Sequence, residues 1–204
     1  MGINIGVCAL QGDVSEHVAA FKAALLASGQ EGEVFSFRRA ADISRCDAIV
    51  LPGGESTTIS RLLHKNDMYG PLRAFKGGIF ATCAGLVLIG REIDDPRVEP
   101  LGIMDISVGR NAFGRQRDSC ERSVTITGEN PPFRGYFIRA PVILSVGPDA
   151  MPLCYADHNV VGAVQGPHMA LSFHPELGGE ISVSTCSFWN ALVHTHRHDR
   201  QFQG

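Results

Sequence analysis

The chain has 204 residues, of which 44% are hydrophobic and 19% are charged, and its formal net charge is −3. This length suits one domain, residues 1–204, with a substantial core. The small negative charge, without a long basic run, argues against a nucleic-acid-binding surface. Because no apolar stretch reaches the roughly 18 residues of a membrane helix, and no basic segment precedes the first strand-like run, we expect a cytoplasmic protein without membrane contacts.

The first half of the chain alternates strand-like and helix-like segments. Residues 4–10 form an apolar strand-like run, and Asp13 with Glu16 resembles a capping pair that opens a helix reaching about Ser28 and closed by Gly29. Further strand candidates follow at residues 33–38, 47–51 and 78–80. Strand, helix and strand at this spacing predict a parallel sheet.

The second half carries short strand-like runs without a long helix between them, at residues 103–108, 123–127, 136–139, 142–144, 160–164 and 169–173. Short turns between strands favour antiparallel pairing. A final helix is expected from Thr185 to about His198. The whole pattern predicts an α/β fold, in which a mostly parallel sheet is flanked by helices and extended by antiparallel strands in the C-terminal half.

Cys83 lies among small residues in the apolar run 78–89. A strand that turns sharply into a helix at such a point resembles a nucleophile elbow, whose next backbone N–H is free to bind an oxyanion. The helix N-terminus would favour the thiolate. Taken alone, a cysteine in an apolar run is more often a small buried residue. The six cysteines are far apart in the sequence, so we expect reduced thiols and no disulfides.

A thiolate nucleophile needs a base, and the base needs an acceptor on its other ring nitrogen. His174-Pro175-Glu176 follows the last strand candidate and supplies both groups. Pro175 biases His174 toward an extended backbone, which lets the two side chains project to one side of the turn. The glycine-rich loop 52–58 also follows a strand, and open α/β sheets bind ligands at such strand ends. We therefore expect Cys83, His174 and this loop to face one crevice.

These motifs together resemble a known family. The elbow 81–85, the loop 52–56 and residues 174–176 are similar to the triad glutamine amidotransferases. Further segments resemble the glutaminase subunits of pyridoxal 5′-phosphate synthases, namely Leu10-Gln11-Gly12-Asp13, Gly54-Glu55-Ser56-Thr57-Thr58, Arg110-Asn111-Ala112-Phe113-Gly114-Arg115-Gln116, Phe137-Ile138-Arg139-Ala140-Pro141 and Ser172-Phe173-His174-Pro175-Glu176-Leu177. One departure is Ala81, where the family's elbow usually has glycine.

The resemblance implies hydrolysis of L-glutamine to L-glutamate and ammonia through a γ-glutamyl thioester. It assigns Cys83 as nucleophile, His174 as base and Glu176 as the orienting carboxylate. The implied glutamine-binding positions are Gly53, Gly54, Glu55, Arg110, Ile138 and Arg139. Backbone N–H groups of Gly54 and Ala84 would hold the oxyanion, and an arginine fork would fit the α-carboxylate. Glu55 would bind the α-ammonium or cap the helix that follows it.

The implied partner is the synthase subunit of the complex, which receives the ammonia. The peptide between Gly53 and Gly54 can turn either its carbonyl or its N–H toward an oxyanion, so we expect the partner to gate activity there. Gln11 and Gly12 end the first strand on the same edge of the sheet and are candidates to relay the contact. No cofactor is implied, and the other histidines lack ligand-like spacing, so we expect no metal.

Two alternatives stay open. The first is another cysteine hydrolase of similar topology, such as a small peptidase or deglycase, but this function does not explain the segments around Arg110 and Arg139. A non-catalytic regulatory subunit leaves the intact set of Cys83, His174 and Glu176 without a purpose. Release of ammonia from glutamine, but not cleavage of peptides, separates the first alternative from the glutaminase.

Overall fold

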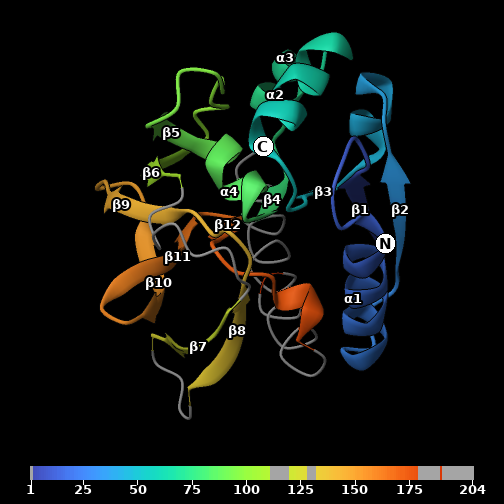
Figure 1. Cartoon of the computed structure of the whole chain (residues 1–204). Helices are drawn as coiled ribbons and strands as arrows, with labels where there is room; N and C mark the ends of the chain where they lie inside the picture. The colour runs from blue at the N-terminus through green and yellow to red at the C-terminus, as the bar shows by residue number, and fades with distance from the viewer. Residues whose placement is uncertain (1, 111–119, 128–131, 179–188, 190–204) are drawn as a thin grey trace.

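The computed structural model describes residues 2–110, 120–127, 132–178 and 189. The strands of its large sheet are β1 (Ile3–Cys8), β2 (Gly32–Phe37), β3 (Ala48–Leu51), β4 (Gly78–Thr82), β7 (Cys120–Ile126), β8 (Phe133–Phe137), β10 (Met151–Ala156), β11 (Asn159–Gln165) and β12 (His168–Leu171). They lie in the order β2-β1-β3-β4-β12-β11-β10-β7-β8 (Figure 1). The predicted α/β fold is therefore confirmed.

The pairing changes from parallel to antiparallel within this sheet. Strands β2, β1, β3, β4 and β12 pair in parallel, and β11, β10, β7 and β8 continue with antiparallel pairs. Strand β12 pairs antiparallel with β11, as expected for the C-terminal half, but it also pairs in parallel with β4, because it inserts between these two strands. Leu171 consequently lies beside Thr82, at the ends of two adjacent parallel strands.

A second sheet contains β5 (Gly90–Ile93), β6 (Met104–Gly109) and β9 (Val142–Val146) in that order. The sequence patterns did not predict β5, β10 or helix α3 (Tyr69–Ala74). Each of these elements begins with, or contains near its start, a residue that disfavours it. Gly90 opens β5, Pro152 is the second residue of β10, and Gly70 is the second residue of α3.

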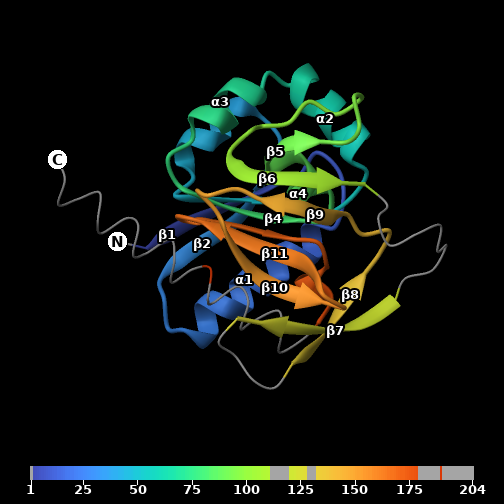
Figure 2. The ribbon, with the colours of Figure 1, turned by 90° about the vertical axis from the view of Figure 1, so that its left-hand side faces the viewer.

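Helices cover both faces of the large sheet. Figure 2 shows α1 (Val14–Ala27) on one side and α2 (Ser56–Lys65), α3 and the second sheet on the other. Side chains alternate between the two faces along the central strands, as the period of a strand requires. In β3, Ile49 and Leu51 belong to the core under α2 and α4 (Ala84–Ile89), whereas Ala48 and Val50 belong to the core under α1.

The ends of α1 give one correction and one confirmation. Asp13 occupies the N-cap position but its side chain makes no capping hydrogen bond, so the predicted pair with Glu16 does not form. At the other end, Gly29 has a φ of 62° and the N–H of Gln30 donates to the carbonyl of Leu25 at 3.0 Å. This is a glycine-terminated helix, as the sequence predicted.

Two short 3₁₀ helices, η1 (Ala40–Arg45) and η2 (Pro175–Leu177), complete the described elements. The helix predicted at 185–198 lies outside the described residues apart from Trp189. This side chain is fully buried, packs against Phe21 and Phe80 at ring-centroid distances of 5.3 and 5.4 Å, and donates to the carbonyl of Pro167 at 2.9 Å. It therefore fixes α1 against the centre of the sheet.

Within the described ranges, no helix is long and apolar enough to cross a membrane. Five of the six cysteines fall in these ranges, and all five carry free thiols, namely Cys8, Cys46, Cys83, Cys120 and Cys154. Cys186 lies outside them.

Candidate active site

The strand, turn and helix predicted around Cys83 are present. β4 ends at Thr82, α4 begins at Ala84, and Cys83 between them has φ 48° and ψ −103°, a conformation that is costly for a side chain with a Cβ. Gly85 must be small, because a Cβ there would lie 2.2 Å from the carbonyl oxygen of Leu51. The elbow forms with Ala81 in place of the family's glycine, and that methyl group is fully buried in the core.

His174 and Glu176 approach this elbow from the end of β12. Nδ1 of His174 lies 2.7 Å from Oε1 of Glu176, and the two side chains are 3% and 0% exposed. The backbone N–H of His174 donates to the carbonyl of Tyr136 at 2.9 Å, which fixes the turn. His174 and Cys83 line the same cavity, and the interaction with Cys83 helps to raise the pKa of His174. The structure therefore brings together Cys83, His174 and Glu176, which form a row at the ends of β4 and β12.

The row is arranged to hold a charged imidazole. Burial alone would lower the pKa of His174, but its hydrogen bonds with Asp13, Cys83 and Glu176 outweigh burial and raise that pKa well above its usual value. Burial alone would raise the pKa of Glu176, but His17 and His174 lower it to about 2. Glu176 is thus an ionised acceptor, and Nδ1 of His174 carries the hydrogen between them.

A cavity of about 250 Å³ opens above Cys83 and His174. It is lined by Gln11, Asp13, Gly54, Glu55, Ser56, Cys83, Ala84, Val87, Arg110, Ile138, Arg139, Pro141 and His174. Most of the predicted binding positions are therefore brought together. Gly53 and Glu176 do not line the cavity. Glu176 lies behind His174, and a Cβ on Gly53 would lie 2.4 Å from Cε1 of the same ring.

The backbone of the elbow and that of the glycine loop both border the cavity. The N–H of Cys83 already donates to the carbonyl of Leu171 at 2.8 Å. The next N–H, of Ala84, belongs to the first turn of α4, where N–H groups have no partner within the helix. Gly54 also lines the cavity, with a φ of 143° that favours glycine. The elbow therefore offers a backbone donor at the cavity with the glycine loop beside it, and such donors stabilise a developing oxyanion.

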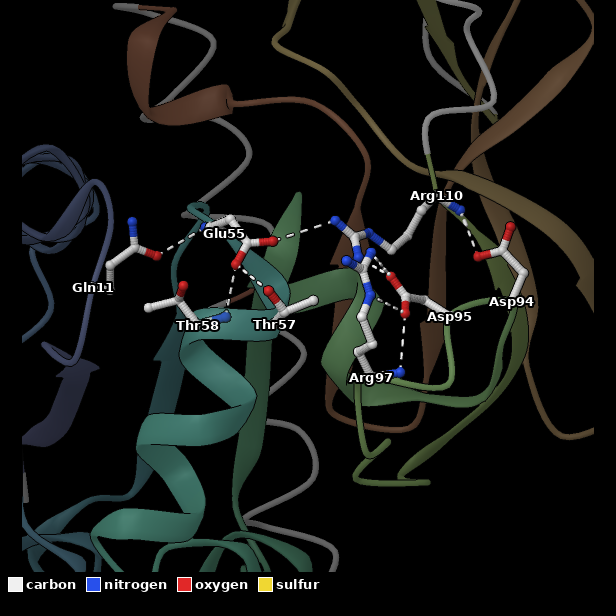
Figure 3. Close-up of polar contacts among 8 residues, drawn as sticks. All are labelled: Gln11, Glu55, Thr57, Thr58, Asp94, Asp95, Arg97 and Arg110. Atoms are coloured by element: carbon white, nitrogen blue, oxygen red, sulfur yellow. Dashed lines mark hydrogen bonds and ion pairs between the residues drawn. The ribbon is translucent and has the colours of Figure 1, made fainter.

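The glycine loop is held by the loop that follows β1. The carbonyl oxygen of Gly53 would lie only 1.7 Å from a Cβ placed on Gly12, so the two backbones pack without a side chain between them. The side-chain oxygen of Gln11 accepts a hydrogen bond from the N–H of Glu55 at 2.8 Å (Figure 3). Gln11 and Gly12 therefore control the position of the loop that carries Gly54.

Glu55 caps α2 (Figure 3), and it also lines the cavity. Its carboxylate accepts from the N–H of Thr58 at 2.7 Å and from the hydroxyl of Thr57. Burial works to raise the pKa of Glu55, but these hydrogen bonds lower it to about 2. Nη2 of Arg110 lies 3.3 Å from Oε1 of the same carboxylate. Both roles expected for Glu55 are thus structurally compatible, since it caps the helix and keeps one oxygen toward the cavity.

Arg110 is held between two carboxylates. It pairs with Glu55 on one side and with Asp95 on the other, and Asp95 also accepts from the side chain of Arg97 at 2.7 and 2.9 Å (Figure 3). The hydrogen bonds from Arg97, followed by the charge of Arg110, hold the pKa of Asp95 well below its usual range. Arg139, by contrast, is exposed at the cavity with a φ of 46°, and no ion pair of its guanidinium is found within the described part of the chain.

Sequence reasoning missed two residues beside the row. The sequence pattern predicts a helix cap at Asp13, yet its carboxylate lies 3.3 Å from Nδ1 of His174. His17 has no ligand-like spacing in the sequence, yet its Nε2 lies 3.2 Å from Oε1 of Glu176. The signal was available, because a helix that starts at the end of a parallel strand directs its first turn toward the same edge of the sheet. Asp13, His174 and Glu176 are close enough to share an ion, but their contacts are those of a hydrogen-bonded network.

Solved structures with the same architecture show which class this fold and site define. A chain described as a glutamine amidotransferase superposes with a TM-score of 0.79 at 35% identity, covering 93% of this chain and 98% of the other. A protein from Thermoplasma acidophilum described as part of a GMP synthase shares the fold, with a TM-score of 0.64 at 14% identity over 98% of each chain. The first of these matches, together with the Cys83 elbow, defines a glutamine amidotransferase.

The chain belongs to the SNO glutamine amidotransferase family, whose model matches residues 7–193. Similar relatives include the pyridoxal 5′-phosphate synthase subunit PdxT of Methanosphaerula palustris, 54% identical over 182 residues, which are 89% of this chain and 93% of that protein. The PdxT of Halobacterium salinarum is 44% identical over 193 residues, covering 93% and 95% of the two chains. The resemblance inferred from the sequence motifs is confirmed.

Proposed function

We propose that this chain is the glutaminase subunit of a pyridoxal 5′-phosphate synthase, and that residues 1–204 act as one cytoplasmic domain. The observation that carries the proposal is the placement of Cys83 and His174 at one cavity, with Glu176 hydrogen-bonded to His174 behind it, in a chain of the SNO family. The reaction is hydrolysis of the side-chain amide of L-glutamine to L-glutamate and ammonia.

In the first half of the proposed reaction, the Cys83 thiolate attacks the amide carbon of glutamine. The carbonyl oxygen becomes an oxyanion held by the N–H groups of Ala84 and Gly54. His174 gives its proton to the amide nitrogen, and the C–N bond breaks to release ammonia. A γ-glutamyl thioester remains on Cys83, while Glu176 keeps the ring of His174 oriented.

In the second half, His174 takes a proton from water, and the resulting hydroxide attacks the thioester. The C–S bond breaks, glutamate leaves, and Cys83 returns as a thiolate. Sγ of Cys83 also lies 3.8 Å from the carbonyl oxygen of Ile138, which lines the same cavity.

For the amino-acid end of glutamine, we propose Glu55 as the acceptor of the α-ammonium and Arg139 as the partner of the α-carboxylate. Arg110 lines the same cavity, but its charge is already shared between Glu55 and Asp95. It is therefore better suited to hold Glu55 in place than to bind a second carboxylate. This assignment decides between the two arginines that the sequence left equivalent.

The proposed partner is a synthase subunit that receives the ammonia. The packing of Gly12 against the carbonyl of Gly53 supports a route for its influence, since movement of the first loop would reorient the peptide that carries the N–H of Gly54. Docking near Gln11 and Gly12 would then set the oxyanion donors. Loss of one such donor costs about a hundredfold to a thousandfold in rate, enough to keep the isolated subunit nearly inactive.

The proposal is tested by incubating the protein and its synthase partner with 6-diazo-5-oxo-norleucine and mapping the adduct by mass spectrometry. We expect one label, on Cys83, together with ammonia release from glutamine but not from peptides. Burial raises the pKa of the Cys8 thiol and of the Cys46 thiol to about 12, so neither should compete. Cys83→Ser should lose both the label and the activity. A label elsewhere, or ammonia release by Cys83→Ser, would contradict the proposed nucleophile.

A further inference from the structure

His17 lies directly behind the row formed by Cys83, His174 and Glu176. It belongs to the first turn of α1, and its side chain is completely buried. Nε2 of His17 lies 3.2 Å from Oε1 of Glu176 and 3.0 Å from Oγ1 of Thr82, the residue that precedes the nucleophile. One ring nitrogen of His17 thus contacts both the turn that carries the base and the strand that carries the elbow.

The ionised state of Glu176 decides which atom is the donor in the contact between His17 and Glu176. Because this carboxylate is ionised, it can only accept, and Nε2 of His17 must carry the hydrogen. Oε1 of Glu176 also accepts from Nδ1 of His174 at 2.7 Å, so a single oxygen is shared by two histidine rings. Oε2 of Glu176 and Nδ1 of His17 are buried, and neither finds a partner within the part of the chain that the structure describes.

We propose that His17 is a positioning residue for glutamine hydrolysis, which holds Oε1 of Glu176 where it accepts from His174. This inference rests on the function proposed above and adds a fourth member to the row. A buried carboxylate with one donor is free to rotate about its side-chain bonds or to take a proton. The second donor opposes both, because the ring of His17 is completely buried and is carried by the first turn of α1.

The simpler role for a buried histidine is to stabilise the fold without affecting the chemistry. The two roles differ in what they change. The titratable groups around His174 are Cys83, Asp13 and Glu176, and those around Glu176 are His17 and His174. If His17 acts through Glu176, its loss weakens the support of the His174 imidazolium and moves the alkaline limb of the activity profile to lower pH. A purely structural role lowers the melting temperature and leaves that limb in place.

The test compares His17→Phe, which keeps the ring volume without a donor, with His17→Gln, whose amide N–H replaces the Nε2 hydrogen. Phe21→Leu is the matched control, since Phe21 is fully buried one turn further along α1 and packs against Phe80 rather than the row. In the complete complex we expect His17→Phe to lower kcat by about tenfold to a hundredfold, the range for a lost hydrogen bond to a charged group, with little change in KM. His17→Gln should restore most of kcat, and Phe21→Leu should change stability alone.

Two further measurements keep the outcome decisive. The rate at which iodoacetamide alkylates the Cys83 peptide, followed against pH by mass spectrometry, reports the thiolate–imidazolium pair without glutamine. The pH dependence of this alkylation rate should shift in His17→Phe even if glutamine proves not to be the substrate. In a Glu176→Ala background, His17→Phe should lower kcat only slightly further, because the two residues act through one contact. The inference would be overturned if folded His17→Phe kept the kcat and the alkylation profile of the wild type. It would also be overturned if His17→Phe lowered kcat as much in the Glu176→Ala background as in the wild type. Neither result would contradict the proposed nucleophile.

Discussion

The carboxylate of Asp13 lies 3.3 Å from Nδ1 of His174, the nitrogen that also donates to Glu176 at 2.7 Å. The base is therefore flanked by two carboxylates of unequal burial, since Asp13 is 41% exposed in its side chain and Glu176 is fully buried. Solvent screens the interaction between the exposed carboxylate of Asp13 and His174. Asp13 thus helps to stabilise the positively charged form of His174, and Glu176 fixes the orientation of its ring.

Asp13→Asn should consequently reduce activity less than Glu176→Gln does. The hydrogen bond to Asp13 raises the pKa of His174, so its loss should move the alkaline limb of kcat/KM to lower pH. We expect less than about a tenfold fall in kcat/KM near neutral pH, because exposed ion pairs are worth about 0.2–1 kcal/mol. A pH–rate profile of the complex measures both effects. A larger loss for Asp13→Asn than for Glu176→Gln would exchange the two roles.

The same row predicts how stability depends on pH. The raised pKa of His174 contributes stability that is complete below its unfolded value of 6.5 and is lost as the pH rises toward the folded value. The lowered pKa of Glu176 contributes stability that is complete above 4.5 and is lost as the pH falls toward about 2. The contribution of this pair should therefore be largest between these unfolded-state values.

Urea unfolding at a series of pH values checks this expectation. The free energy of unfolding should fall from about pH 6.5 upward in the wild type, and this slope should be smaller in His174→Gln, which cannot carry the charge. An identical alkaline slope in the two proteins would show that other groups cause it.

Arg139→Ala should raise KM for glutamine by about tenfold to a hundredfold, with a smaller effect on kcat, because a charge-assisted hydrogen bond to the α-carboxylate is lost. Arg134→Ala provides the control, since Arg134 is also exposed and lies on β8 but pairs with Glu121 outside the cavity. Steady-state kinetics with glutamine decide the question. If Arg110→Ala raised KM and Arg139→Ala did not, the roles proposed for the two arginines would have to be exchanged.

Gly12→Ala should reduce glutamine hydrolysis both with and without the synthase partner. Its methyl group would collide with the carbonyl of Gly53, so the peptide that presents the N–H of Gly54 must move. Loss of that donor predicts about a hundredfold to a thousandfold lower kcat. Gly29→Ala separates this effect from backbone strain, because Gly29 also has a positive φ but nothing lies within 4 Å of its Cβ position. Equal activities of the two variants would argue against control through Gly53.

The chemistry at the strand ends could be predicted from the sequence because it depends on local patterns. The small residues around Cys83 specify the elbow, and His174-Pro175-Glu176 specifies the turn that carries the base. The parallel placement of β12 could not be predicted, since it depends on which strand inserts between two others rather than on any local pattern. The roles of Asp13 and His17 depend in turn on that placement, which brings η2 against the start of α1.

The pairing of Arg110 shows a second limit. Its segment indicated a functional arginine, but the carboxylates that hold it come from the helix cap at Glu55 and from Asp95, which follows β5 of the second sheet. Asp95 carried no sequence signal, because β5 itself was not predicted. A residue whose charge is already shared is therefore difficult to distinguish from one that binds substrate until both partners are in place.

Leu171 and Thr82 are paired neighbours in adjacent parallel strands, and the nucleophile and the base follow within three residues of them. The distance between the two reacting side chains is therefore inherited from the interstrand spacing, about 4.8 Å in any sheet, rather than from the loops. Lengthening the chain between them, for example at the β10–β11 turn through Asp157 and His158, would leave this distance unchanged. Adding a single residue inside β4 or β12 would change this distance, because every later side chain in that strand would move to the opposite face of the sheet.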